Sequence, residues 1–161
     1  MEEQEVDTES LHGVIHEHVR QIPWAEKVAL TTALLALLAA VSSLMSAHES
    51  DRAIRYEIEA SDQWSYYQAK SIKAMLTQDA TEKARYKDEE KEIQKKAEER
   101  TRESGHATHT HEFFAFAVTI FQVATAIGAI AVLVKKKLFW RTSLALGVVG
   151  IGLFVRAMLL F

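Results

Sequence analysis

The charged residues of this chain are segregated, and this segregation restricts the possible folds more than any single motif does. Nineteen basic and 22 acidic residues are present, yet residues 28–47 and 113–134 contain none, and residues 138–161 contain only Arg141 and Arg156. At about 1.5 Å of rise per residue, each apolar segment is long enough to cross the hydrocarbon core of a bilayer as a helix. The sequence therefore predicts an all-α integral membrane protein with three transmembrane helices.

The bulk composition excludes several classes of function. The chain has no cysteine, which excludes disulfides, thiol catalysis, cysteine-ligated zinc and iron–sulfur clusters. The net charge of −3 and the absence of an arginine-rich patch argue against nucleic acid as a partner. The six glycines form no phosphate-binding loop. Because no nucleophile–base or paired-acid constellation stands out, we expect no enzyme and no cofactor.

The N-terminal segment has two predicted parts. Residues 1–9 contain four Glu and one Asp without a basic residue, and we expect a disordered acidic tail. Residues 10–22, with Ser10 as N-cap, are predicted to form an amphipathic helix at the membrane interface. Its apolar residues have helical spacing: Leu11, Val14, Ile15, Val19 and Ile22. Transmembrane helix 1 then covers residues 23–47, and its long apolar run favours an uncleaved anchor over a signal peptide.

Residues 48–112 are predicted to form a charged, coiled-coil-like helical hairpin between transmembrane helices 1 and 2. Neither Gly nor Pro occurs between Trp24 and Ser104, which predicts one long helix through residue 76. A turn follows, with Asp79 as N-cap and Glu82 at position N3, and Gly105 is expected to end the second helix. A weak 3–4 spacing, in which only some positions are apolar, runs through the second helix: Tyr86, Glu90, Ile93, Ala97, Arg100, Ser104 and Ala107.

A basic loop sets the expected orientation. Residues 135–138 connect transmembrane helix 2 (residues 113–134) to transmembrane helix 3 (residues 139–161). The three lysines of this loop and Arg141 just after it supply four positive charges without an acidic residue. Such loops are cytoplasmic. The N-terminus is therefore expected in the cytoplasm, with the hairpin and C-terminus outside it, in a multi-pass protein of a bacterial inner (plasma) membrane.

Three groups of polar or small residues occur within the spans. Gln122 lies near the middle of helix 2, where an amide requires a hydrogen-bonding partner, and with Thr119 and Thr125 it could alternatively line an oligomeric pore. Arg156 is expected to anchor at the interface, and its candidate counter-ions are Glu49, Glu112 and the C-terminal carboxylate of Phe161. Small residues suited to close helix packing, within or between protomers, lie in two stripes: Thr32, Ala36, Ala40, Ser43 and Ala47; and Ser143, Gly147 and Gly150.

Four histidines are predicted at one membrane level, at the base of the hairpin: His48, His106, His109 and His111. Together with Glu49 and Glu112 they could bind a divalent metal, although their spacing matches no dedicated zinc motif. A pH-responsive patch and an ordinary solvated turn are the alternatives.

The most distinctive local segment is residues 60–73, in which aromatic and amide side chains replace aliphatic ones. Trp64, Tyr67 and Ser71 share one helical face, and Lys70 is one turn from Tyr66, within reach of a cation–π contact. We expect association through this segment or packing against the returning helix. The candidate interaction residues are Gln63, Trp64, Tyr67, Gln68, Lys70 and Ser71.

This segment, read as Gln-Trp-x-x-Tyr-Gln-Ala-Lys-Ser from Gln63 to Ser71, together with residues 143–147, resembles a bacterial family of small membrane proteins catalogued only as a domain of unknown function. The resemblance extends over nearly the whole chain after the acidic tail. It implies an N-terminal span, a charged helical linker and a C-terminal pair of spans, and it implies no activity, cofactor or substrate.

The expected function is structural. The chain is predicted to be a non-enzymatic, membrane-anchored homo-oligomer that presents its hairpin outside the cytoplasm, with the bilayer, further copies of itself and an envelope protein as partners. A small channel or transporter subunit with helix 2 lining the pore is one alternative. Metal or pH sensing through His48, His106, His109 and His111 is another.

Overall fold

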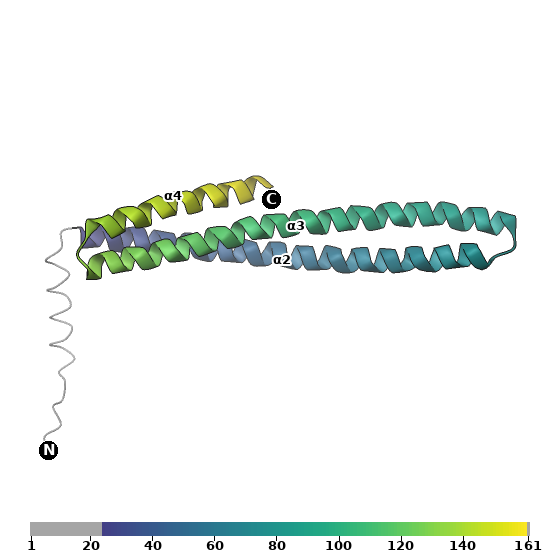
Figure 1. Cartoon of the computed structure of the whole chain (residues 1–161), viewed down its shortest axis with the longest axis horizontal. Helices are drawn as coiled ribbons and strands as arrows, with labels where there is room; N and C mark the ends of the chain where they lie inside the picture. Colours follow the sequence, from purple (N-terminus) through teal and green to yellow (C-terminus); the bar gives the residue numbers. More distant parts are fainter. Residues whose placement is uncertain (1–23, 161) are drawn as a thin grey trace, which may run out of the picture. The chain divides into compact units, whose positions relative to one another are not determined.

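The computed structural model describes residues 24–160, which form three α-helices: α2 (Ala25–Leu76), α3 (Ala80–Leu133) and α4 (Lys137–Leu160) (Figure 1). Each helix is long and apolar enough to cross a membrane. The all-helical architecture of a multi-pass membrane protein is thus the one that the charge distribution predicts. The predicted acidic tail and interfacial helix, residues 1–22, and the carboxylate of Phe161 lie outside the described residues.

The long helix predicted through residue 76 is confirmed, since α2 is uninterrupted over 52 residues. The turn to α3 follows at residues 77–79. Asp79 acts as the predicted N-cap, because its Oδ1 accepts a hydrogen bond of 2.8 Å from the backbone N–H of Thr81. Glu82, at the predicted position N3, accepts a hydrogen bond of 3.2 Å from the hydroxyl of Thr77.

The prediction that Gly105 ends the second helix is wrong. Helix α3 continues through it for 54 residues and carries the charged segment into the apolar one without a break. Gly105 has no positive φ, and a Cβ added to it would meet nothing within 4 Å. A single helical glycine costs only about 1 kcal/mol relative to alanine, so the helical residues on both sides determine the conformation.

The connection from α3 to α4 is a tight cap made without glycine. Lys135 adopts a left-handed conformation with φ of 55°. Its N–H bonds to the carbonyl of Val132, and the N–H of Lys136 bonds to the carbonyl of Ala131, both at 3.2 Å. These are the two hydrogen bonds of a Schellman motif. They allow α4 to begin at Lys137, two residues earlier than the predicted third span.

The described residues pack as two compact units. The apolar unit comprises residues 24–41 of α2 with Ala117–Gly152, and the polar unit comprises Ser42–Phe116 with residues 153–160. The core of the apolar unit is built mainly from small residues around a few large ones: Val28, Leu35, Ala39, Ala117, Phe121, Ala124 and Ala131. The core of the polar unit also contains hydroxyl and carboxylate side chains: Ser42, Ser46, Glu49, Ser104 and Thr110.

In the polar unit α2 and α3 contact each other along faces with 3–4 spacing (Figure 1). On α3 this face coincides with the weak 3–4 spacing of the sequence, since Ile93, Ala97, Ser104 and Ala107 are buried and the other members are partly buried. The facing residues of α2, here called the inner face of α2, are buried or partly buried at the same spacing: Ser42, Ser46, Glu49, Ala53, Tyr56, Ala60, Gln63, Tyr67, Lys70 and Ala74.

Candidate interaction site

The polar unit is held together by a seam of side-chain bonds between α2 and α3, and the seam begins at Ser46 and His111. The Nδ1 atom of His111 lies 2.8 Å from the backbone oxygen of Ser46 and 3.0 Å from its hydroxyl. Because a carbonyl oxygen can only accept, Nδ1 carries a proton and donates it to that oxygen. The ring is therefore fixed in one tautomer, or in the doubly protonated form.

A buried carboxylate lies one turn further along α2. Glu49 is only 1% exposed, and its Oε1 accepts a hydrogen bond of 2.8 Å from the guanidinium of Arg52. Arg52 also lies 5.9 Å from the ring centroid of Tyr56. Hydrogen bonds to Tyr56 and Glu49 raise the pKa of Arg52. The cation therefore remains charged beside the buried carboxylate, whose burial would be costly without it.

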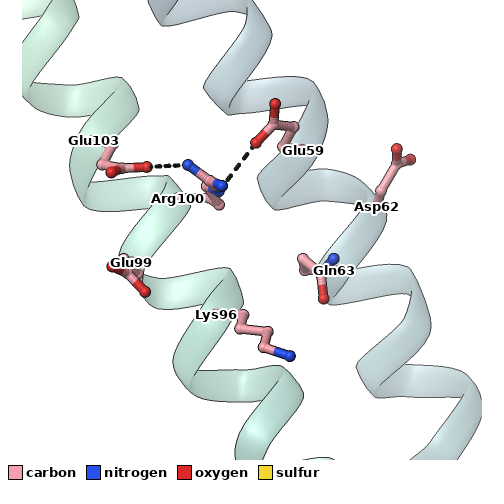
Figure 2. Close-up of a pocket in the computed structure, with 7 residues that line it drawn as sticks. All are labelled: Glu59, Asp62, Gln63, Lys96, Glu99, Arg100 and Glu103. Atoms are coloured by element: carbon pink, nitrogen blue, oxygen red, sulfur yellow. Dashed lines mark hydrogen bonds and ion pairs between the residues drawn. The ribbon is translucent and has the colours of Figure 1, made fainter.

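Ser104 and Arg100 join the helices in the middle of the seam. The Ser104 hydroxyl lies 3.1 Å from the backbone oxygen of Ala53 and 3.1 Å from Oε2 of Glu57. Arg100 forms ion pairs with Glu59 on α2 at 3.0 Å and with Glu103 on its own helix at 2.6 Å (Figure 2). The hydrogen bond to Glu103 and the charge of Glu59 raise the pKa of Arg100.

A polar groove surrounds Arg100 (Figure 2). Its volume is about 600 Å³, and it is lined from both helices by Glu59, Asp62, Gln63, Lys96, Glu99, Arg100 and Glu103. Four of the seven lining residues are acidic and two are basic. Arg100 engages two of the four carboxylates. Because the acidic side chains outnumber the basic ones, the groove has a net negative charge.

The residues of the distinctive segment complete the seam near the turn. The indole Nε1 of Trp64 donates to the hydroxyl of Thr101 at 3.4 Å, and the Trp64 ring contacts Tyr67 edge-on at 5.6 Å. A hydrogen bond from the Tyr67 hydroxyl to Glu90 raises the pKa of Tyr67. Trp64 and Tyr67 therefore bond to α3 from adjacent turns of α2.

Lys70 is the last cross-link of the seam before the turn. Its ammonium forms an ion pair with Glu89, which raises the pKa of Lys70 and lowers that of Glu89. The same ammonium lies 5.4 Å from the ring centroid of Tyr66 and 5.3 Å from that of Tyr86. The predicted cation–π contact with Tyr66 is confirmed, and Tyr86 on α3 adds a second ring.

The six candidate interaction residues thus have different environments. Trp64, Tyr67 and Lys70 bond to α3, Gln63 lines the polar groove, Ser71 is partly buried and Gln68 is exposed. Their α3 partners Glu89, Glu90 and Thr101 were not predicted as site residues. The 3–4 spacing of α3 could have indicated Glu90 and Arg100, since both belong to it.

The four predicted histidines are not brought together as a metal site. His48, His106 and His109 are exposed, His109 meets Phe113 edge-on at 5.1 Å, and His111 bonds to Ser46. Within residues 24–160, no group of three or more His, Asp or Glu side chains is arranged to hold a metal ion.

Arg156 has an aromatic neighbour. Its guanidinium lies 5.0 Å from the ring centroid of Phe113. Of its predicted counter-ions, Glu49 is engaged by Arg52, and Glu112 is exposed.

Of the three predicted polar residues of span two, two lie on the outer, exposed side of α3 and Thr125 is partly buried. Thr119 and Gln122 are exposed, and the hydroxyl of Thr125 donates to the backbone oxygen of Phe121 on its own helix at 2.8 Å. Among the described residues, no hydrogen bond joins the Gln122 amide to another helix. The small residues Ala126 and Ala129 on the same face are also exposed.

The apolar unit is held by close approach of small residues and by a few hydrogen bonds. The hydroxyl of Ser143 donates to the backbone oxygen of Ala124 at 2.6 Å, and the indole of Trp140 donates to Thr31 at 3.2 Å. Gly147 and Gly150 are buried against Leu35 and Phe121, where a Cβ would approach to 2.8 and 2.7 Å. The small residues of α4 therefore pack within the protomer.

The small stripe of α2 behaves differently. Thr32 is partly buried, but Ala36, Ala40, Ser43 and Ala47 are exposed. These residues are therefore available for contact with another chain in a way that Ser143, Gly147 and Gly150 are not.

Comparison with known proteins identifies a family for the whole described region. The family model described as a domain of unknown function, DUF4337, matches residues 24–84 and again residues 76–160. No curated protein and no solved structure matches the chain. The two matches together cover most of the sequence, and the chain therefore belongs to the DUF4337 family.

Proposed function

We propose that this protein is a non-enzymatic, membrane-anchored interaction protein that acts as a homo-oligomer and presents the α2–α3 pair of the polar unit as a coiled-coil hairpin outside the cytoplasm. The observation that carries the proposal is the seam. Trp64, Tyr67 and Lys70 are used to hold α2 against α3. A helix pair fixed along its length in this way is a scaffold whose outer surfaces can serve recognition.

The outer side of α3 supports self-association within the membrane. Gln122, with Thr119, Ala126 and Ala129 on the same face, is exposed on a helix apolar enough to span a bilayer. An amide in hydrocarbon is stabilised by a partner, and small residues beside it let a second helix approach closely. A second copy of the chain would supply both the hydrogen-bonding partner and the closely packed helix.

The proposed orientation rests on the basic α3–α4 connection. Lys135, Lys136, Lys137 and Arg141 lie within seven residues without an acidic neighbour, which supports a cytoplasmic connection and an extracytoplasmic hairpin. We propose an inner (plasma) membrane location, with an envelope protein as a further partner of the hairpin.

The oligomeric state tests the main proposal. Native mass spectrometry of the detergent-solubilised full chain should show a defined oligomer, and chemical crosslinking in membranes should give the same stoichiometry. A strict monomer in both measurements would refute it. For the orientation, Asp88→Cys introduces the only cysteine, and it should react with an impermeant maleimide on intact cells. Labelling only after the membrane is breached would reverse the topology.

A small channel or transporter subunit is the second candidate, because Thr119 and Gln122 are exposed on one span and could line a pore between protomers. Ion flux into liposomes containing the purified chain should then be measurable and should fall in the Gln122→Leu variant. Absent flux, or flux unchanged by the substitution, argues for the scaffold alone.

A further inference from the structure

The outward surfaces of α2 and α3 in the polar unit differ in one respect. On α2, Ile54, Ile58 and Ile72 are 57%, 58% and 55% exposed, and Leu76 is 78% exposed. On α3, over the described residues from Ala80 to Ala115, no large hydrophobic side chain is exposed to a comparable degree. Between residues 47 and 115, the exposed large apolar side chains therefore lie on α2.

The three isoleucines and Leu76 belong to one regular face, while Tyr66 and Met75 of the same helix, 51% and 75% exposed, lie beside it. Positions spaced by three, four and four residues repeat every 11 residues along α2, which keeps them on one side of a nearly straight helix. We call this set the outer face of α2: Ala47, Ser50, Ile54, Ile58, Ser61, Ser65, Ala69, Ile72 and Leu76. All are exposed except Ser50, which is half-buried.

The outer face of α2 carries no charge. Residues 47–76 contain nine Asp, Glu, Lys or Arg side chains, and none of them lies at the nine positions of the face. Charges instead occupy its two borders, and Arg55 and Glu57 fall on opposite sides of it by helical position. A solvated helical face in so charged a segment would be expected to contain charged residues.

The surface also contains a hollow next to two of the isoleucines. A groove of about 350 Å³ is lined by Ile54 and Ile58 with Ala53, Glu57, Ser104 and Thr108. Its walls are mostly apolar, so a side chain from a second helix could enter it as a knob enters a hole.

We propose that the outer face of α2 is the surface through which two copies of this chain pair, in parallel and in register. The inference rests on the homo-oligomer proposed above and specifies its contact. In a parallel twofold pair each residue near the axis faces its own copy, so any charge there would meet an identical charge. A face without charge over 30 residues satisfies this requirement, whereas an unrelated partner could compensate charges with opposite ones.

Two further features favour a second copy. Helix α2 continues into an apolar segment long enough to span the membrane, so two chains in one bilayer present the outer face at equal height. In a parallel pair the opposite borders of the two faces meet, which brings Arg55 of one copy toward Glu57 of the other. Self-pairing therefore buries the isoleucines and matches the charges beside them.

Single-cysteine crosslinking tests the contact directly, because the natural chain has no cysteine. Ser61→Cys lies on the outer face, and Asp62→Cys is its exposed neighbour about 100° around the helix. Under mild oxidation in native membranes, Ser61→Cys should form a disulfide-linked dimer at least fivefold more than Asp62→Cys. Equal crosslinking of both, or none at residue 61, would overturn the proposed contact.

A charge test distinguishes self-pairing from another occupant. Ile58→Asp should reduce dimer formation at least tenfold, because two carboxylates would face each other. Ile58→Lys should do the same, because two ammonium groups would face each other. Mixing the two variants should restore a heterodimer. Since Ile58 is exposed in the single chain, helicity by circular dichroism should stay unchanged in both.

The homo-oligomer and its contact through the outer face of α2 can be refuted separately. If native mass spectrometry shows an oligomer while residue 58 is insensitive and residue 61 does not crosslink, the outer face is not the contact, although the homo-oligomer stands. If Ile58→Asp abolishes capture of a different protein but mixing does not restore a heterodimer, the occupant is that protein. A monomeric wild-type chain refutes both proposals.

Discussion

The two units of this protein share the helices α2 and α3, but different chemistry holds the helices together in each unit. In the apolar unit Gly150 and Gly147 bring α4 against Phe121 and Leu35. In the polar unit, hydroxyls, carboxylates and cations link the helices. Lipid offers no hydrophobic gain for helix contact, so association there depends on close approach. A polar pair in water depends on specific bonds. The stability of the apolar unit should therefore respond to changes in side-chain volume. The stability of the polar unit should respond to the loss or exchange of polar atoms.

The largest effect is expected where a charge is buried in the polar unit. Arg52→Met keeps an unbranched apolar stem but leaves the Glu49 carboxylate, 1% exposed, without its cation. Leaving one partner of a buried ion pair uncompensated costs about 3 kcal/mol, which thermal unfolding in detergent can detect. The double variant Glu49→Gln, Arg52→Met should recover most of the loss. Equal destabilisation in the single and double variants would show that the ion pair does not matter.

In the apolar unit the expected sensitivity is to volume alone. Gly150→Ala places a methyl group 2.7 Å from the buried ring of Phe121, and overpacking of this kind costs roughly 1–3 kcal/mol. Gly152→Ala is the matched control two residues away, since its Cβ meets nothing within 4 Å. This control should be neutral or stabilising by about 0.5–1 kcal/mol, because alanine favours the helix. Similar unfolding temperatures for the two variants would contradict the close packing.

Sequence alone predicts the parts of this structure that depend on one helix at a time. The distribution of charge indicates the three apolar helices, and the weak 3–4 spacing from Tyr86 to Ala107 coincides with the residues of α3 that contact α2. The prediction that Gly105 ends a helix was wrong because helix propensity describes the glycine itself. It does not describe how strongly the turns on both sides favour the helix.

The candidate site could be predicted only in part, for a related reason. Trp64, Tyr67 and Lys70 fit either a partner protein or the returning helix, and the choice depends on where Glu89, Glu90 and Thr101 lie. The position of these partners is a property of the pair and is not encoded in the spacing of α2. The charge-free outer face was overlooked because its 11-residue period is diluted by serine and alanine.

A buried hydroxyl provides a smaller test of the polar unit. Ser104→Ala removes the hydrogen bonds to the Ala53 carbonyl and to Glu57, and loss of a buried hydrogen bond costs about 1 kcal/mol. Thr81→Ala is the control, because this threonine is exposed on α3 and alanine there should be neutral or slightly stabilising. If Ser104→Ala also left the unfolding temperature unchanged, the middle of the seam would rest on packing instead of polar bonds.

The smallest effect should be the pH dependence of the seam near the turn. The ion pair with Lys70 lowers the pKa of Glu89 below its ordinary value of 4.5. Its stabilisation is therefore present above pH 4.5 and is lost as the pH falls through the lowered pKa. Lys70 and Tyr67 have pKa values raised above 10.5 and 10.0, so their contributions are complete below these values and are lost as the pH rises further.

Unfolding temperatures measured from pH 3 to pH 11 should therefore show a plateau with a decline at each end. Glu89→Gln should lower the plateau slightly and flatten the acid decline, because this variant has no carboxylate to protonate at position 89. Gly150→Ala provides the contrast between the two units. Its cost arises from the volume beside Phe121 and should be the same at every pH. An acid decline that Glu89→Gln leaves unaltered would assign the pH dependence to carboxylates other than the one paired with Lys70.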